Sequence, residues 1–212
     1  MKCPICETRK PRRFCPGMRA EICSICCGEQ REVTIDCPLD CPHLIEARLH
    51  EKQPTLNPDT FPNQDVQLTD RFLREHEAVL FFGGMTLLHA ALKTPGAIDF
   101  DIREALESLI RTYRTLESGL YFESLPQNPI AAAIHKSVQE QVATVRKKMA
   151  EKGESAFRDV EFLAILVLLQ RLELQHNNGR KRGRAFIDFL RSQFPRPDEE
   201  EEKPSGSLIQ TV

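Results

Sequence analysis

Hydrophobic residues recur every three or four positions along much of the chain after residue 66, the spacing of a helix that buries one face. The clearest stripe is Ile102, Ala105, Leu106, Leu109, Ile110, Tyr113 and Leu116. A second stripe is Ile130, Ile134, Val138, Val142, Val145 and Met149. It follows Pro129, which suits a first helical turn because its φ is already helical. These stripes predict two amphipathic helices.

Three further segments complete a predicted helical domain. Thr69 is a suitable N-cap for a helix that runs to about Ala91 and is interrupted by Gly83-Gly84. Residues 162–169 are all apolar, a run too short to span a membrane and typical of a helix buried on nearly all sides. A last helix is expected over 183–194. Few strand signals compete, so we predict a bundle of four to six helices in a mainly α protein.

Polar and proline-rich stretches mark the expected domain boundaries. A short helix over 44–52 leads into a linker at 51–65, where Pro54, Pro58 and Pro62 favour an extended chain. We therefore predict a cysteine-rich module over 1–50 and an α-helical domain over 66–195. Residues 196–212 contain five consecutive acids, Asp198 to Glu202, and are typical of a disordered acidic tail.

All eight cysteines fall within the first 41 residues, at Cys3, Cys6, Cys15, Cys23, Cys26, Cys27, Cys37 and Cys41. Two CxxC pairs separated by sixteen residues have the spacing of a structural zinc site. The N-terminus lacks the apolar run of a signal peptide, so an intracellular, cytoplasmic location is expected, where paired cysteines favour metal over disulfides. We predict zinc, with disulfides, a redox pair or an iron–sulfur cluster as alternatives.

Eight thiolates suit two closed, tetrahedral zinc ions. We assign Cys3, Cys6, Cys23 and Cys26 to one ion, and Cys15, Cys27, Cys37 and Cys41 to the other. Exchange of Cys26 and Cys27 is the alternative, and His43 is an alternative ligand. A short segment with few aliphatic residues cannot bury a sufficient core, so the metal must supply folding free energy. Because full cysteine ligation leaves no position for water, it argues against catalysis by zinc.

The order Cys3-x2-Cys6, Cys15-Pro16 and Ile22-Cys23-Ser24-x2-Cys27 resembles the HIT and MYND zinc fingers. That resemblance covers the first forty residues and implies an interleaved, treble-clef-like or cross-braced module that mostly binds proteins. In such fingers Cys27, rather than Cys26, would join Cys3, Cys6 and Cys23. The chain departs from the pattern at Met18, where the family has a cysteine, and near Arg31, where it has a histidine.

The net charge of −2 and the pI of about 6.3 do not favour nucleic-acid binding by the whole chain. Two basic clusters, at 9–13 and 180–184, are candidate phosphate contacts. We expect the first to balance thiolate charge and the second to pair with the acidic tail. No aromatic platform is recognised between the basic residues of either cluster.

Catalytic motifs are not recognised. His76-Glu77 begins like HExxH, but Leu80 stands at the second histidine position. Glu173-x-x-His176 has no second copy and is expected on an exposed helix face. His89 and His135 lie near apolar stripes and are expected to be core histidines with satisfied hydrogen bonds.

We therefore predict a non-enzymatic zinc protein that acts as a protein-interaction adaptor or regulatory factor. A protein partner is expected, and no membrane association. One alternative is a nucleic-acid-associated factor in transcription or RNA processing that uses clusters 9–13 and 180–184. A zinc–thiolate redox sensor is the other alternative.

Overall fold

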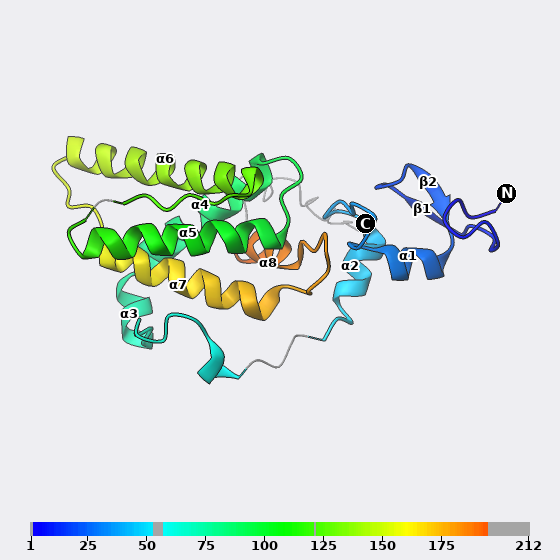
Figure 1. The fold of residues 1–212 in the computed structure, drawn as a ribbon, viewed down its shortest axis with the longest axis horizontal. Helices are drawn as coiled ribbons and strands as arrows, with labels where there is room; N and C mark the ends of the chain where they lie inside the picture. Colours follow the sequence, from blue (N-terminus) through cyan, green and yellow to red (C-terminus); the bar gives the residue numbers. More distant parts are fainter. Residues whose placement is uncertain (1, 53–56, 121, 195–212) are drawn as a thin grey trace, which may run out of the picture.

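The computed structural model describes residues 2–52, 57–120 and 122–194. Within these ranges it contains eight α-helices and one two-stranded sheet, which confirms the mainly α fold class. Figure 1 shows a cysteine-rich part with β1, β2, α1 and α2 at one end of the molecule and a bundle of the remaining helices at the other. The predicted tail at 196–212 lies outside the described residues.

The bundle has six α-helices in the described ranges, at the upper limit of the predicted four to six. They are α3 (Asp70–Glu75), α4 (Glu77–Lys93), α5 (Asp99–Glu117), α6 (Pro129–Glu151), α7 (Asp159–His176) and α8 (Ala185–Gln193). As predicted, Pro129 occupies the first turn of α6. Helix α7 contacts α4, α5 and α8, which explains why its apolar run at 162–169 is buried except for Leu168.

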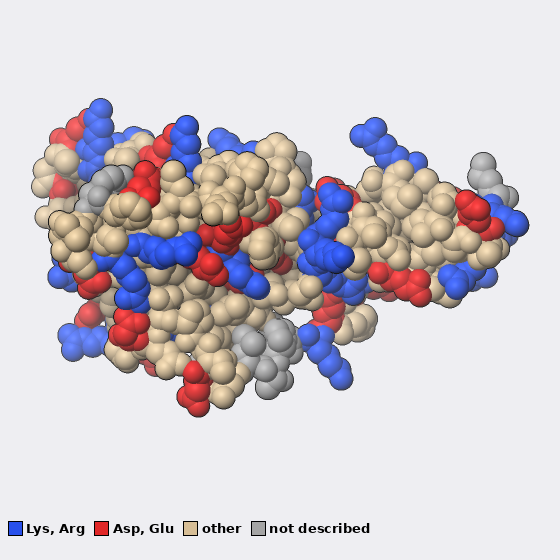
Figure 2. Space-filling model, viewed as in Figure 1, with Lys and Arg blue, Asp and Glu red and all other residues tan. Residues whose placement is uncertain are grey.

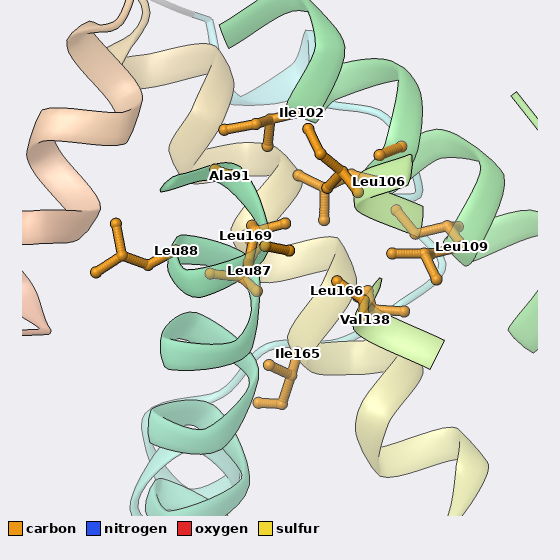
Figure 3. Packing of buried hydrophobic residues seen from close by; sticks show 14 of the residues in the cluster. Leu87, Leu88, Ala91, Ile102, Leu106, Leu109, Val138, Ile165, Leu166 and Leu169 are labelled. Atoms are coloured by element: carbon orange, nitrogen blue, oxygen red, sulfur yellow. The ribbon is translucent and has the colours of Figure 1, made fainter. Parts of the chain in front are cut away.

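Side chains from four helices meet in the bundle core (Figure 3). Leu87 of α4, Leu106 of α5, Val138 of α6, and Ile165 and Leu169 of α7 are each at most 2% exposed. Full burial of such a side chain contributes roughly 1.5–3 kcal/mol relative to exposure. The predicted stripes of α5 and α6 thus form the faces that close this core.

The helix predicted from Thr69 is divided, but not at its glycines. The Thr69 hydroxyl accepts the Phe72 N–H at 3.1 Å, as an N-cap does, and α3 then ends at His76. His76 leaves the helical conformation, with φ −117° and ψ 25°, before α4 begins. Gly83 lies inside α4, where an added Cβ would stand 2.8 Å from the Ile165 Cγ2 atom. Its role is therefore the close approach of α4 to α7.

The cysteine-rich part contains the hairpin β1 (Arg13–Cys15) and β2 (Ala20–Ile22), followed by α1 (Ser24–Gln30) and α2 (Pro42–Arg48). Helix α2 begins and ends earlier than the predicted 44–52, because Pro42 opens its first turn and its regular helix stops at Arg48. A second, small core contains eight buried or half-buried cysteines together with Ile22, Ile35 and Leu44.

The segment predicted as a linker contacts the bundle beyond residue 56. It forms a short 3₁₀ helix, η1 (Pro58–Thr60), and then runs along α5 and α7. The Asn63 amide donates to Gln170 at 2.8 Å, and Arg171 donates to the Asn63 carbonyl at 2.7 Å. Arg114 on α5 pairs with Asp65 at 2.8 Å. Residues 63–65 are therefore fixed to the bundle by hydrogen bonds.

Candidate metal centre

Four cysteine sulfurs form a compact group at the far end of the cysteine-rich part. The Sγ atoms of Cys3, Cys6, Cys23 and Cys26 all lie within 4.8 Å of one another, and those of Cys6 and Cys23 are 4.0 Å apart. Ligands of a tetrahedral zinc ion with bonds of about 2.3 Å stand about 3.8 Å apart. The sulfur positions therefore fit a tetrathiolate metal site with little rearrangement.

Local backbone structure aims these sulfurs at a common point. Cys3 begins a turn closed by hydrogen bonds from the Glu7 N–H to the Cys3 carbonyl at 2.8 Å and from the Cys3 N–H to the Arg9 carbonyl at 2.9 Å. Cys23 is the N-cap of α1, and its sulfur accepts the Cys26 N–H at 3.4 Å. One CxxC pair thus comes from a loop and the other from a helix N-terminus.

Hydrogen bonds and burial act on the thiols of this group in opposite directions. Hydrogen bonds from the Thr8 side chain and the Arg9 backbone lower the pKa of Cys6 to about 5. Burial raises the pKa of Cys3, but N–H groups, that of Cys23 foremost, outweigh it and leave the pKa lowered. Burial, and then the Cys23 side chain, raises the pKa of Cys26 to about 12. A cation is required before all four sulfurs can be thiolates together.

Arg9 supplies one positive charge next to this group. Its hydrogen bond with the Cys23 side chain raises the pKa of the guanidinium. Arg9, one member of the first basic cluster, therefore lies where it can balance thiolate charge.

The other four cysteines lie in the same small core but are less tightly gathered. Cys15, Cys27, Cys37 and Cys41 are 7–9% exposed. Burial raises the pKa of Cys37, and the charges of Glu32, Cys15 and Cys41 add to the effect. Within the described residues, the only set of three or more Cys, His, Asp or Glu ligand atoms within 4.8 Å of one another is the first group. A second metal site therefore stays a prediction.

The first group also distinguishes between the two pairings left open by the sequence. It contains Cys26 and not Cys27, in agreement with the spacing argument rather than with the finger resemblance. Half-buried His43 lies in the first turn of α2 and does not belong to the group.

Glu32 joins the cysteine-rich part to the bundle, and sequence reasoning missed it. Its side chain is fully buried, and its φ of 52° is rare for a residue other than glycine. Its carboxylate accepts from Arg48 at 2.8 Å, from Asn178 at 2.7 Å and from the Arg184 N–H at 2.9 Å. Its carbonyl accepts the Arg182 N–H at 2.8 Å. A single glutamate in a polar stretch gives no sequence signal of such a role.

The second basic cluster, 180–184, lies at the same contact between the cysteine-rich part and the bundle. We call this contact, formed by Glu32 with Arg48, Asn178, Arg182 and Arg184, the Glu32 joint. Arg180 donates to the Arg31 carbonyl at 2.8 Å and lies 3.7 Å from the Glu51 carboxylate. Arg182 and Arg184 lie 3.8 and 3.5 Å from the Asp36 carboxylate. Figure 2 shows basic side chains gathered where the two parts meet. The acidic tail expected to pair with this cluster lies outside the described residues.

Two expectations about titratable residues in the bundle are wrong. Glu173 is fully buried rather than on an exposed face, because Arg103 binds its carboxylate with two hydrogen bonds, at 2.8 and 3.0 Å. His135 is fully buried, but neither ring nitrogen has a hydrogen-bond partner in the described structure. The Glu123 carboxylate lies 3.9 Å from its Nδ1 atom. Burial lowers the pKa of His135, which favours the neutral ring.

None of the described helices combines the length and the apolar character needed to cross a bilayer. Comparisons with protein-family models, curated proteins and solved structures found no match to this chain. The arguments for function therefore rest on the residues themselves.

Proposed function

We propose that this protein is a non-enzymatic adaptor whose cysteine-rich part is built around two structural zinc ions. The geometry of the Cys3, Cys6, Cys23 and Cys26 sulfurs carries the proposal, because four thiolates close the coordination shell of zinc. Such a site stabilises a fold and offers no vacant position for an activated water. The four further buried cysteines come from β1, α1 and the segment before α2, and would bind the second ion after a rearrangement that brings their sulfurs together.

An exposed apolar loop on the bundle supports binding to a protein partner. Leu120, Phe122 and Leu125, between α5 and α6, are 69%, 68% and 62% exposed. The loop is anchored, since Thr115 donates to the Phe122 carbonyl at 3.0 Å and the Ser124 N–H donates to Thr112 at 2.9 Å. Large apolar side chains held in water by a fixed loop favour a protein interface.

One experiment tests both halves of the proposal: partner capture combined with zinc analysis of the tagged full chain. Wild type should retain two zinc ions and a protein partner. Phe122→Ser with Leu125→Ser should lose the partner and keep both ions, whereas Leu49→Ser, at a residue 79% exposed on the other part, should keep the partner.

The Cys23→Ser variant completes the design, because it removes a ligand of the first group. It should lose at least one zinc ion, while Ser24→Ala beside it should lose none. A zinc-free wild-type chain would contradict the metal half of the proposal. A partner that binds the Phe122→Ser/Leu125→Ser variant as tightly as wild type would contradict the assignment of the loop.

A further inference from the structure

We propose that the hairpin surface binds single-stranded nucleic acid. The hairpin surface is defined as Lys10, Arg12, Phe14, Met18 and Arg19, on β1 and the segments that flank it. Arginine and lysine side chains would contact phosphates, and the Phe14 ring would stack on a base. This inference goes beyond the adaptor function and does not depend on the protein partner.

The cations of the hairpin surface are available for phosphates. None of Lys10, Arg12 and Arg19 takes part in an ion pair with a described acid, in contrast to the cluster at 180–184. Residues 2–22 contain six Lys or Arg and two Glu, which gives a charge of +4. The two zinc tetrathiolates of the proposed function would together contribute −4, but their sulfurs are buried or half-buried, whereas Lys10, Arg12 and Arg19 are exposed at the surface. Unpaired cations next to one another attract a polyanion.

Phe14 provides the aromatic platform that sequence reasoning did not recognise. It follows Arg13 directly and is 59% exposed on β1, and nearby Met18 is 40% exposed. Residues two apart on a strand share a face. Arg12, which extends β1 through its hydrogen bond to Ile22, therefore points to the same side as Phe14, and Arg13 points to the opposite side with Cys15. Glu21 stands opposite Phe14 on β2 and would disfavour a phosphate close to the ring. The ring is therefore suited to a base, with the phosphates nearer the arginines.

Backbone hydrogen bonds connect the hairpin surface to the segments that carry Cys3 and Cys23, and so fix its shape. The Arg12 N–H donates to the Ile22 carbonyl at 2.9 Å, which extends the pairing of β1 with β2 up to Cys23. The Cys3 N–H bonds to the Arg9 carbonyl at the other side of the basic loop. A preformed surface loses less conformational entropy on binding. Figure 1 places this hairpin at the end of the molecule away from the bundle, where a strand of nucleic acid can approach.

The presence of the Phe14 ring among the cations of the hairpin surface favours nucleic acid over an acidic peptide as the ligand. A nucleic-acid strand alternates phosphates with flat bases, and base–aromatic stacking contributes roughly 1–3 kcal/mol per base without requiring a particular sequence. An acidic peptide would satisfy the cations equally well, but it would gain little from a single planar ring that is open to solvent.

Fluorescence anisotropy with the zinc-loaded full chain tests the proposal. The probes are labelled single strands of twelve thymidines and twelve uridines, which separate DNA from RNA; binding of either supports the proposal. Affinity should fall as salt rises. Phe14→Ser should weaken binding about tenfold, in line with the loss of one stacked base, and should leave the salt slope unchanged. Arg12→Ala should reduce the slope by about one.

Matched variants distinguish this surface from general effects of charge and hydrophobicity. Phe100→Ser, at a phenylalanine that is also 59% exposed, and Lys147→Ala on α6 should leave affinity unchanged. Phe14→Tyr should retain affinity, which separates loss of stacking from loss of folding. Zinc content and circular dichroism of each variant verify that the metal centre is intact.

Three outcomes would overturn the proposal. The first is no binding of either strand at about 50 mM salt, where phosphate contacts are strong. Another is unchanged affinity in both the Phe14→Ser and Arg12→Ala variants. The last is displacement of the strands by a twelve-residue glutamate peptide at equal concentration, with no effect of Phe14→Ser, which would mark a docking surface for acidic proteins.

Discussion

Asp99 illustrates how a single buried carboxylate shapes the chemistry of the bundle. Its two oxygens accept the N–H groups of Phe186 and Ile187, at 3.0 and 3.1 Å, in the first turn of α8. Burial raises its pKa from the ordinary 3.8 to about 7, although the two N–H groups act in the opposite direction. The folded protein therefore holds a proton on Asp99 at a pH where the unfolded chain has released it.

The stability of the protein should fall as pH rises from about 4 to about 7 because of Asp99. With one pKa unit equivalent to about 1.4 kcal/mol, three units correspond to a loss of about 4 kcal/mol at most. Asp99→Asn cannot titrate, so the stability advantage of wild type over this variant should shrink across the same window. Denaturant unfolding of both proteins at pH 5 to 8 measures the difference. A constant or growing difference would show that Asp99 is ionised in the folded protein throughout.

The sequence predicts the metal ligands well and the other residues discussed above poorly. Cys3, Cys6, Cys23 and Cys26 follow from spacing, because a CxxC turn can aim two sulfurs at one point almost independently of the rest of the fold. Glu32 and Asp99 could not be predicted from the sequence. Apart from Arg48, the hydrogen-bond partners of the Glu32 carboxylate lie 146–152 positions away, and those of the Asp99 carboxylate lie 87–88 positions away. Phe14 directly follows the basic cluster 9–13, and the sequence alone does not show that its ring is exposed.

Among the elements, α4 and α7 pack closely because Gly83 has no side chain. An added Cβ would meet the Ile165 Cγ2 atom at 2.8 Å, and Ile165 is itself fully buried. Glycine inside a helix costs roughly 1 kcal/mol relative to alanine, so its presence in α4 reflects the packing rather than helix propensity. Gly28 in α1 offers the opposite case, since a Cβ there would meet no atom within 4 Å.

Gly83→Ala should lower the stability of the bundle by about 1–3 kcal/mol, because overpacking exceeds the gain in helix propensity. Gly28→Ala should be neutral or raise stability by up to about 1 kcal/mol, because only the propensity changes. Thermal unfolding followed by circular dichroism compares the two variants with wild type. If Gly83→Ala were as stable as wild type, Ile165 would have to move aside at no cost, contrary to the tight packing of the core.

Periodicity predicted the long elements well and the breaks between them poorly. Helices α5 and α6 each present one apolar face to the core, so their three-and-four spacing was sufficient. The division between α3 and α4 occurs at His76, whose ring nitrogen bonds back to the Phe72 carbonyl at 2.9 Å. Neither glycine nor proline lies at that break. Gly83 and Gly84, where the sequence predicts an interruption, lie inside α4 and allow close packing instead.

Across the whole molecule, two separate cores are joined chiefly through polar contacts centred on Glu32. One core contains the cysteines and the other contains the faces of α4 to α8. Leu39 is an apolar residue of the cysteine-rich part that packs against the bundle core. Because Glu32 lies between α1 and Cys37, its position depends on the fold that the metal centre supports.

Removal of metal with a chelator should destabilise the contacts of Glu32 with the bundle while the bundle itself stays folded. The amides of Arg182 and Arg184 donate to Glu32, so their hydrogen exchange should become at least tenfold faster without metal. The amide of Phe186, which donates to Asp99 within the bundle, should remain protected. Glu32→Gln in the metal-loaded chain should accelerate the same two amides. Equal acceleration at Phe186 would instead show that both parts unfold together.

The polar character of the Glu32 joint has a thermal consequence. Exposure of apolar surface raises heat capacity, whereas exposure of polar surface lowers it. Opening the joint uncovers carboxylate, guanidinium and backbone groups together with Leu39 and the aliphatic parts of the arginines, so the polar and apolar contributions to the heat capacity nearly cancel. The free energy of the joint should then vary almost linearly with temperature, while each core follows a curved profile. Cooling would weaken the apolar cores without releasing the contact that holds them together.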